Sequence, residues 1–270
     1  MSSKFSAAWR MLRREGVSAV VRRFGWYINK WYTSDNWWIG RLVEVRGNRA
    51  MLDGCHFDLS SPVIGTAQKA GFFWGNYETG ERQVLDYLTT GGLALVELGG
   101  SIGAMACISS RHFGNPAQHI VVEANPNLIP VLTRNRDLNG CRFTIVHAAV
   151  AYGTSEVPFH VHSKFVKSSL LAMDEQTQTV SVPTITLGQI FDRHNFNQIV
   201  LFCDIEGAEI DLFQHEWDVI AARVKYLSLE VHPYLTGTAA VDDLQRRLNE
   251  NGFRQLYNRK QNYLFINDRL

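Results

Sequence analysis

The sequence of 270 residues lacks the features that mark secreted, zinc-binding, membrane-spanning and nucleic-acid-binding proteins. Its four cysteines do not lie at zinc-ligand spacing and follow no secretory signal, so we expect free thiols in a reducing cytosol. No apolar run reaches the roughly 18–20 residues of a membrane span. A net charge of +1 predicts no general affinity for nucleic acid. We therefore expect a cytoplasmic protein with no nucleic-acid partner.

Two phosphate-binding motifs are also missing. A dinucleotide site needs Gly-x-Gly-x-x-Gly, with the pyrophosphate on a helix N-terminus. The glycine-rich turn here is Gly99, Gly100 and Gly103, and Ser101 and Ile102 stand where the two possible registers need glycine. The Gly-Lys-Ser/Thr of a P-loop is missing as well. The turn is therefore not a typical phosphate site.

Basic charge is concentrated at the N-terminus. Residues 1–31 carry seven basic residues and one acidic residue, a net charge of +6, which leaves −5 for the rest of the chain. Apolar residues recur at helical spacing within residues 4–32 and predict one or two helices. These helices either pack on the main domain or form a basic amphipathic surface that contacts anionic lipid at the inner face of the membrane.

The rest of the chain predicts an α/β fold. Residues 41–59 favour two or three short strands, and a helix is expected over 79–89. Further strands are predicted at 93–98, 119–123, 143–147, 155–161, 180–185, 198–204, 224–230, 253–258 and 262–266. Helices are predicted at 102–112, 127–138, 187–193 and 238–251, with another after "EGAE". The alternation indicates a doubly wound, mostly parallel sheet whose closing hairpin contributes one antiparallel strand.

Two carboxylates follow the first two strands of that unit. Glu97 lies at the end of a strand, where it repels phosphate but suits a cationic ligand. S-adenosylmethionine carries an ammonium group and a sulfonium and has no phosphate. Glu123 comes 20 residues after Gly103. A carboxylate there can accept hydrogen bonds from both ribose hydroxyls, which nicotinamide enzymes also exploit.

Six ordered segments resemble the FkbM-type S-adenosylmethionine-dependent methyltransferases: "VELGGSIGAMACISSRHFG", "VVEANPNLIPVLTRNRDLNG", "VHAAVA", "VPTITLGQI", "VLFCDIEGAEIDLF" and "LSLEVHP". The resemblance covers roughly residues 74–266. It implies a class I methyltransferase (Rossmann-like) fold with the sheet order 3-2-1-4-5-7-6 and O-methylation of hydroxyl groups. Glu97 and Phe202 depart from the family pattern, which has Asp and commonly Lys at these places. We divide the chain into an N-terminal helical and small β extension, 1–73, and a methyltransferase domain, 74–270.

The resemblance also implies a set of residues that bind S-adenosylmethionine. They are Glu78 in "NYE", Glu97, Gly99, Gly100, Ser101 and Gly103 in the turn, Glu123, Ala124 and Asn125 after the second strand, Ala148 and Ala149 in "VHAAVA", and Asp204 and Glu206 in "CDIEGAE". By family position, Asp204 lies near the methionine moiety or the incoming hydroxyl.

Acids and one histidine end the fourth and fifth strands of the unit. A sugar hydroxyl has a high pKa, so its methylation needs a general base or a metal. We predict His232 as the base, with Asp204 and Glu230 as further catalytic residues. Mg²⁺ or Mn²⁺ bound by Asp204, Glu206, Glu230 and His232 is an alternative. We do not favour it, because acids at strand ends are expected in any methyltransferase, and we assign no metal ligands.

His160 and His162 alternate on one predicted strand and share a face. They belong either to a solvated strand edge or to a lid that contacts the acceptor, because the following loop is long and polar.

These observations favour an O-methyltransferase that acts on a hydroxyl of a sugar, polysaccharide or glycoconjugate. Two alternatives are a methyltransferase for a soluble polyketide-type or amino-sugar metabolite and a noncatalytic module that retains the fold. A nucleic-acid methyltransferase is disfavoured by the charge and by "DIEG", which stands where an Asn/Asp-Pro-Pro-aromatic signature would be. Loops build acceptor pockets and vary freely, so the sequence does not name the acceptor.

Overall fold

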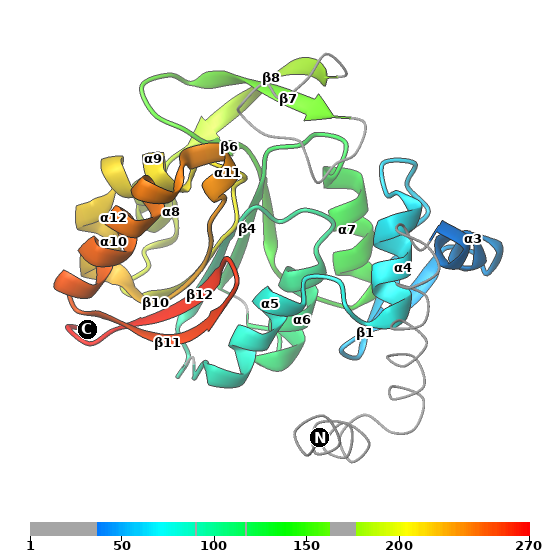
Figure 1. The fold of residues 1–270 in the computed structure, drawn as a ribbon, viewed down its shortest axis with the longest axis horizontal. Helices are drawn as coiled ribbons and strands as arrows, with labels where there is room; N and C mark the ends of the chain where they lie inside the picture. The colour runs from blue at the N-terminus through cyan, green and yellow to red at the C-terminus, as the bar shows by residue number, and fades with distance from the viewer. Residues whose placement is uncertain (1–36, 90, 117, 163–176) are drawn as a thin grey trace.

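A seven-stranded sheet forms the centre of the computed structural model, which describes residues 37–89, 91–116, 118–162 and 177–270. The strand order is β11-β12-β10-β9-β3-β4-β5 (Figure 1). The strands are Ala94–Leu98 (β3), His119–Glu123 (β4), Thr144–His147 (β5), Ile199–Cys203 (β9), Val224–Glu230 (β10), Phe253–Arg259 (β11) and Asn262–Asn267 (β12). β12 runs antiparallel to β10 and β11, and the other neighbours pair in parallel. Counted along the chain, the order is 3-2-1-4-5-7-6. The doubly wound sheet and its antiparallel strand are thereby confirmed.

Helices cover both faces of this sheet (Figure 1). Successive strand residues point to opposite faces, so neighbouring residues belong to different cores. Leu95 packs in one core with residues of α6 and α7, and Val96 packs in the other with residues of α8, α9 and α12. These helices span Ala104–His112 (α6), Ile129–Leu138 (α7), Leu187–His194 (α8), Glu209–His215 (α9), Trp217–Arg223 (α10), Pro233–Thr236 (α11) and Thr238–Glu250 (α12). Every residue of β3, β4 and β9 is buried, as expected for parallel strands covered on both sides.

A second, three-stranded sheet lies at the top of Figure 1, in the order β6-β8-β7. Its strands are Ala149–Val150 (β6), Glu156–His162 (β7) and Thr177–Ile185 (β8). The strands predicted at 155–161 and 180–185 are confirmed. His160 lies on β7 with its Nδ1 3.1 Å from the Thr179 hydroxyl of β8. The loop on which the lid hypothesis depends, 163–176, lies outside the described residues.

The described part of the N-terminal extension differs from the prediction in two places. Residues 41–45 were expected in a strand but belong to the helix Trp37–Val45 (α3), because Ile39 and Val43, four residues apart, turn the same face inward. A second helix, Thr66–Trp74 (α4), was not predicted. The expected hairpin is present as Arg49–Leu52 (β1) and Cys55–Asp58 (β2).

The helix predicted over 79–89 is a single α turn, Thr79–Arg82 (α5), followed by the 3₁₀ helix Gln83–Tyr87 (η1).

This extension packs directly on the central fold. The backbone N–H groups of His56 and Asp58 on β2 donate to the side-chain oxygens of Asn139 and Asn135, each at 2.8 Å. Phe57, fully buried, belongs to the same core as α6 and α7. The boundary placed at residue 73 stays a prediction, since residues on both sides of it share one core.

Two further expectations concern the N-terminus and the membrane. The helices predicted within residues 4–32 lie outside the described residues. Among the residues that the structure describes, no helix has the length and apolar character to cross a membrane.

Candidate active site

The turn after β3 brings two chain segments into close contact. Gly99 has a φ of 93°, and a Cβ placed on it would lie 1.7 Å from the backbone oxygen of Asp204. A Cβ on Gly100 would lie 2.3 Å from Val121. Only glycine therefore lets the ends of β3 and β9 meet here. Gly103, by contrast, faces Leu132 of α7 and does not line the cleft described below.

Glu123, the last residue of β4, is held in place by two short backbone hydrogen bonds. Its Oε2 accepts from the N–H of Ser101 and its Oε1 from the N–H of Asn125, each at 2.6 Å. Burial raises the pKa of Glu123 to about 7, although these hydrogen bonds act in the opposite direction. The carboxylate is thereby oriented before any ligand binds.

Around this carboxylate lies a cleft with about 910 Å³ of space between its atoms, part of it open to solvent. Its walls combine the glycine turn with apolar residues such as Met105, Leu128, Val150 and Phe159. The predicted cofactor-binding residues that line it are Glu78, Glu97, Gly99, Gly100, Ser101, Glu123, Ala124, Asn125, Ala148, Ala149, Asp204 and Glu206. The structure therefore brings together all of that set except Gly103.

Glu97 lies at the floor of the cleft with 3% of its surface exposed. Its Oε2 has no hydrogen-bond partner and lies 4.0 Å from Nε2 of the buried His119. Burial lowers the pKa of His119 to about 3, so this histidine is neutral and does not form an ion pair. Burial, with the nearby charges of Glu78 and Asp204, raises the pKa of Glu97 well above its usual range. Among the described residues, Oε2 therefore has no hydrogen-bond donor.

The predicted catalytic residues lie around a second hollow of about 570 Å³. Asp204 and Glu206 follow β9, Glu230 is the last residue of β10, and His232 lies two residues after it. The lining is otherwise polar and comprises Tyr77, Glu78, Gly80, Glu81 and Asn262. Five residues line both hollows, namely Tyr77, Glu78, Glu81, Asp204 and Glu206. The two hollows are therefore neighbours that meet at these side chains.

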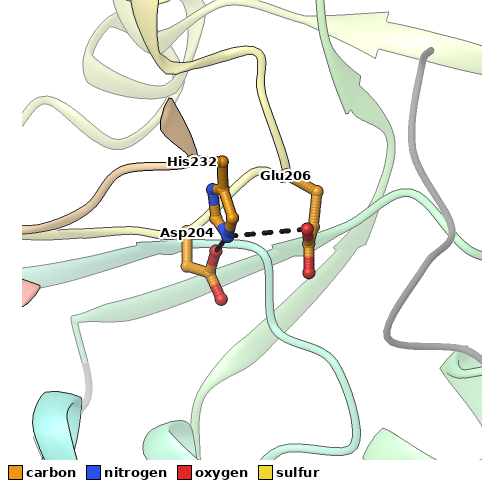
Figure 2. Close-up of side chains that lie close together, drawn as sticks. All are labelled: Asp204, Glu206 and His232. Carbon is orange, nitrogen blue, oxygen red and sulfur yellow. Dashed lines mark ion pairs between the residues drawn. The ribbon is translucent and has the colours of Figure 1, made fainter. Parts of the chain in front are cut away.

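His232 is the centre of a charged group on the wall of this second hollow, called the acceptor hollow below. Its Nε2 lies 3.6 Å from Oδ1 of Asp204 and 3.5 Å from Oε2 of Glu206 (Figure 2). Its Nδ1 lies 3.0 Å from Oε1 of Glu209, whose side chain is 1% exposed. Only 6% of His232 is exposed, so the surrounding structure fixes its ring.

Glu209 also holds the loop between β9 and α9. It accepts hydrogen bonds from the backbone N–H of Ile205 and of Gly207, at 3.0–3.2 Å. Within that loop Glu206 has a φ of 49°, a left-handed conformation that is uncommon outside glycine. One buried carboxylate thus sets both the loop that carries Glu206 and the orientation of His232.

The comparison with protein families agrees with this geometry. The model described as the methyltransferase FkbM domain matches residues 103–255, which is more than half of the chain. The chain belongs to the FkbM methyltransferase family. The match includes the β4 carboxylate, the Asp204–Glu209 loop and His232, while Glu97 precedes it.

Solved structures similar to this FkbM methyltransferase are distant. A protein of the NADB-Rossmann superfamily from Streptococcus agalactiae is 15% identical, with a TM-score of 0.42, over 70% of this chain and 66% of that chain. M. jannaschii TYW2 in complex with AdoMet is 11% identical, with a TM-score of 0.37, over 79% and 80%. The N-terminal domain of human METTL16 in complex with SAH is 10% identical, with a TM-score of 0.35, over 70% and 67%. No curated protein matches the sequence.

Negative charge dominates the acceptor hollow of this FkbM methyltransferase. Burial raises the pKa of Asp204 well above its usual range, and the charges of Glu230 and Glu206 add to the effect. Burial also raises the pKa of Glu206, and raises that of Glu78 to about 7. These carboxyl groups therefore compete for protons or for a cation.

The state of His232 bears on its predicted role. Burial alone would lower its pKa, but the hydrogen bond with Glu209 and the charges of Asp204, Glu209 and Glu206 outweigh burial and raise it to about 9. A protonated imidazole cannot accept a proton at pH 7. That His232 acts as the general base stays a prediction. It requires that bound ligands change the balance of charges that raises the pKa of His232.

Two groups of side chains among the described residues could hold a metal ion. Asp204, Glu206 and His232 form one, and Glu81, Asp204 and Glu230 form the other. In each group the candidate ligand atoms lie within 4.8 Å of one another. Asp204 belongs to both.

Three contributors to the site were not assigned from sequence. Tyr77 and Glu81 line both hollows, and the segment "NYETGE" carried a signal for Glu81, which lies one helical turn after Glu78. Glu209 was considered only as a helix-start acid, whereas it supports His232.

Phe202, which replaces the family's common Lys, is buried beside Glu97 and Asp204 in a small cavity.

Proposed function

We propose that this chain is an S-adenosylmethionine-dependent O-methyltransferase that acts on a hydroxyl of a sugar, polysaccharide or glycoconjugate. The observation that carries the proposal is the junction of the two hollows at Asp204 and Glu206. A methyl donor in the first hollow can face an acceptor oxygen in the second. Positioning of this kind supplies much of the acceleration of a methyl transfer.

The residues of the cleft fit S-adenosylmethionine. Three buried polar atoms of its lining residues lack partners, Oε2 of Glu97, Nδ2 of Asn125 and Oδ1 of Asp204. The first can accept from an ammonium group, and the second can donate to a ring nitrogen of adenine. Glu123 presents two oriented oxygens to the ribose hydroxyls. The acidic lining of the cleft is unsuited to a phosphate.

The chemistry divides between the two hollows. When bound, S-adenosylmethionine supplies a methyl group on a sulfonium, which departs as a neutral thioether. The chain's residues hold the acceptor oxygen in line with that methyl and remove the hydroxyl proton. Asp204 lies at the junction, where either task is possible, and Glu230 and His232 lie on the acceptor side.

The acceptor hollow supports a polyhydroxylated acceptor. Its lining is polar, with carboxylates, the Asn262 amide and the Tyr77 ring. Carboxylate and amide oxygens accept hydrogen bonds from several hydroxyls at once. An amino-sugar would also suit this negative charge, and it is the second candidate that the electrostatics favours.

Incubation of the protein with methyl-labelled S-adenosylmethionine and fractionated cell extract tests the proposal. Label in polysaccharide or glycolipid supports it, and label in small molecules supports the soluble-metabolite alternative. If S-adenosylhomocysteine binds but no fraction acquires label, the noncatalytic alternative gains support.

We further propose that the basic N-terminal segment brings the enzyme to a lipid-linked acceptor at the membrane. Its net charge of +6 over residues 1–31 motivates this step. Flotation with vesicles of anionic lipid should recover the full chain and lose a variant without residues 1–31. Equal recovery of the two would remove the membrane contact from the proposal.

A further inference from the structure

The arrangement around His232 requires a proton or a cation between Nε2 and the neighbouring carboxyl groups. Nδ1 faces the carboxylate of Glu209 at 3.0 Å, so Nδ1 carries the hydrogen of that bond. Nε2 then points at Asp204 and Glu206 (Figure 2). A bare lone pair directed at two carboxylates is repelled by both. A proton, on Nε2 or on one of the two carboxyl groups, or a cation between the three side chains must compensate.

The distances favour a cation between the side chains. A charge-assisted N–H···O bond spans about 2.7–2.9 Å, whereas Nε2 lies 3.5 Å from Glu206 Oε2 and 3.6 Å from Asp204 Oδ1. Ligand atoms bound to one metal ion at about 2.1 Å are roughly 3.0 Å apart in octahedral geometry and about 3.4 Å apart in tetrahedral geometry. The observed 3.5 and 3.6 Å lie just above the tetrahedral spacing and about 0.5–0.6 Å above the octahedral one, so an octahedral ion would draw the three side chains inward.

A buried carboxylate oxygen of the group provides a further indication. Oδ1 of Asp204 is buried and has no hydrogen-bond partner. Buried polar atoms in proteins are normally paired. The unpaired Oδ1 of Asp204 therefore points to a positively charged ligand at this atom.

The surroundings of His232 match those of a metal-binding histidine. Such a histidine donates its second ring N–H to a carboxylate or carbonyl, which fixes the ring and the tautomer. Glu209 takes this place, and it is itself fixed by the N–H groups of Ile205 and Gly207. The group Glu81, Asp204 and Glu230 has no histidine and no comparable support among the described residues.

We propose that Asp204, Glu206 and His232 bind one divalent cation of the Mg²⁺ or Mn²⁺ class, with Glu209 positioning His232. The site rests on the proposed function, because the ion would lie on the wall of the acceptor hollow, next to the cofactor cleft. The two carboxylates suit Mn²⁺ and Mg²⁺, and the imidazole favours Mn²⁺, the transition-metal ion of the two. The ion would bind the acceptor hydroxyl and lower its pKa, so that a weak base of the hollow such as Glu230 could take the proton while the oxygen receives the methyl group and the neutral thioether leaves.

Mn²⁺ titration of the full chain saturated with S-adenosylhomocysteine, followed by electron paramagnetic resonance, tests the site. We expect one ion per chain and a nitrogen coupling from the imidazole in the pulsed spectrum. Asp204→Asn and Glu206→Gln should each weaken Mn²⁺ binding at least tenfold. Asp243→Asn, on the exposed surface of α12, should leave it unchanged.

Three results would overturn the site: no binding at millimolar Mn²⁺, bound Mn²⁺ without nitrogen coupling, or binding that is lost in Glu230→Gln but kept in Glu206→Gln. The wild-type spectrum decides even if the variants fold poorly. Calorimetric binding of S-adenosylhomocysteine without metal is measured in parallel. A chain that binds S-adenosylhomocysteine but no Mn²⁺ contradicts the metal site alone, whereas loss of S-adenosylhomocysteine binding contradicts the proposed function.

Discussion

Replacement of Glu123 by Gln is expected to weaken the binding of S-adenosylhomocysteine strongly. Both carboxylate oxygens are already used, one by Ser101 N–H and the other by Asn125 N–H, each at 2.6 Å. An amide has only one oxygen, so its NH₂ must face one of these N–H groups. The variant therefore loses one oriented acceptor for the ribose as well as the negative charge.

The magnitude follows from the hydrogen bonds at risk. A hydrogen bond to a charged group contributes about 1.5–3 kcal/mol, and a buried donor left unpaired costs about 1–3 kcal/mol. Part of the second cost affects the unliganded protein as well and cancels in binding. We expect a loss of about 2–3 kcal/mol in the free energy of binding, which is roughly 30- to 160-fold in Kd.

Isothermal titration calorimetry at pH 8, where the wild-type carboxylate is ionised, measures the effect. Glu250→Gln, at an exposed position on α12, is the matched control and should bind like the wild type. Thermal melting of each variant separates a folding defect from a binding defect. A change of less than threefold in Kd for a folded Glu123→Gln would refute the role of Glu123 as the ribose ligand.

Three further predictions concern pH, the support of His232 and cofactor choice. Burial raises the pKa of Glu123 from 4.5 to about 7 in the folded chain. Between these pH values the folded chain binds more protons at Glu123 than the unfolded chain does, so the contribution of Glu123 to the free energy of unfolding falls as pH rises. Ribose binding favours the ionised form, so S-adenosylhomocysteine should bind more tightly at pH 8 than at pH 6 and release protons; a pH-independent Kd and enthalpy would contradict this. Glu209→Gln should lower the free energy of unfolding by about 2–4 kcal/mol, because buried donors lose a charged acceptor. The exposed Asp211→Asn on the same helix should change it by less than about 0.5 kcal/mol, and equal stability of the two variants in urea would contradict the role of Glu209. S-adenosylhomocysteine should raise the melting temperature and NAD should not; an equal shift with NAD would argue for a dinucleotide site.

The central sheet could be predicted from sequence because its pattern is local and strong. β3, β4 and β9 are continuous apolar runs that end in glycine or acid, and such runs are typical of buried parallel strands. The secondary structure of the N-terminal extension was harder to predict. Residues 41–45 alternate well enough for a strand, and only their packing against α4 makes them helical. Short segments of this kind take their structure from tertiary contacts rather than from local propensity.

The candidate site likewise contains residues that the sequence could locate and one whose role it could not. Motif positions located Glu97, Glu123 and Asp204, because the carboxyl ends of parallel strands meet at one edge of the sheet. The role of Glu209 could not be read from the sequence, since its side chain turns back toward His232, 23 residues further along the chain. The metal alternative was not favoured from sequence because acids at strand ends are common. The metal proposal rests on the distances around Nε2, which the sequence does not contain.

The most direct test of the account is the chemical position of the transferred methyl group. Protein incubated with methyl-labelled S-adenosylmethionine and the active extract fraction is removed, and the product is hydrolysed to monosaccharides and separated by mass. The account predicts label in an O-methyl ether of a sugar, formed by the wild type and lost in Asp204→Asn that still binds S-adenosylhomocysteine. Label on nitrogen, on nucleic acid or on protein, or no label despite tight cofactor binding, would contradict it.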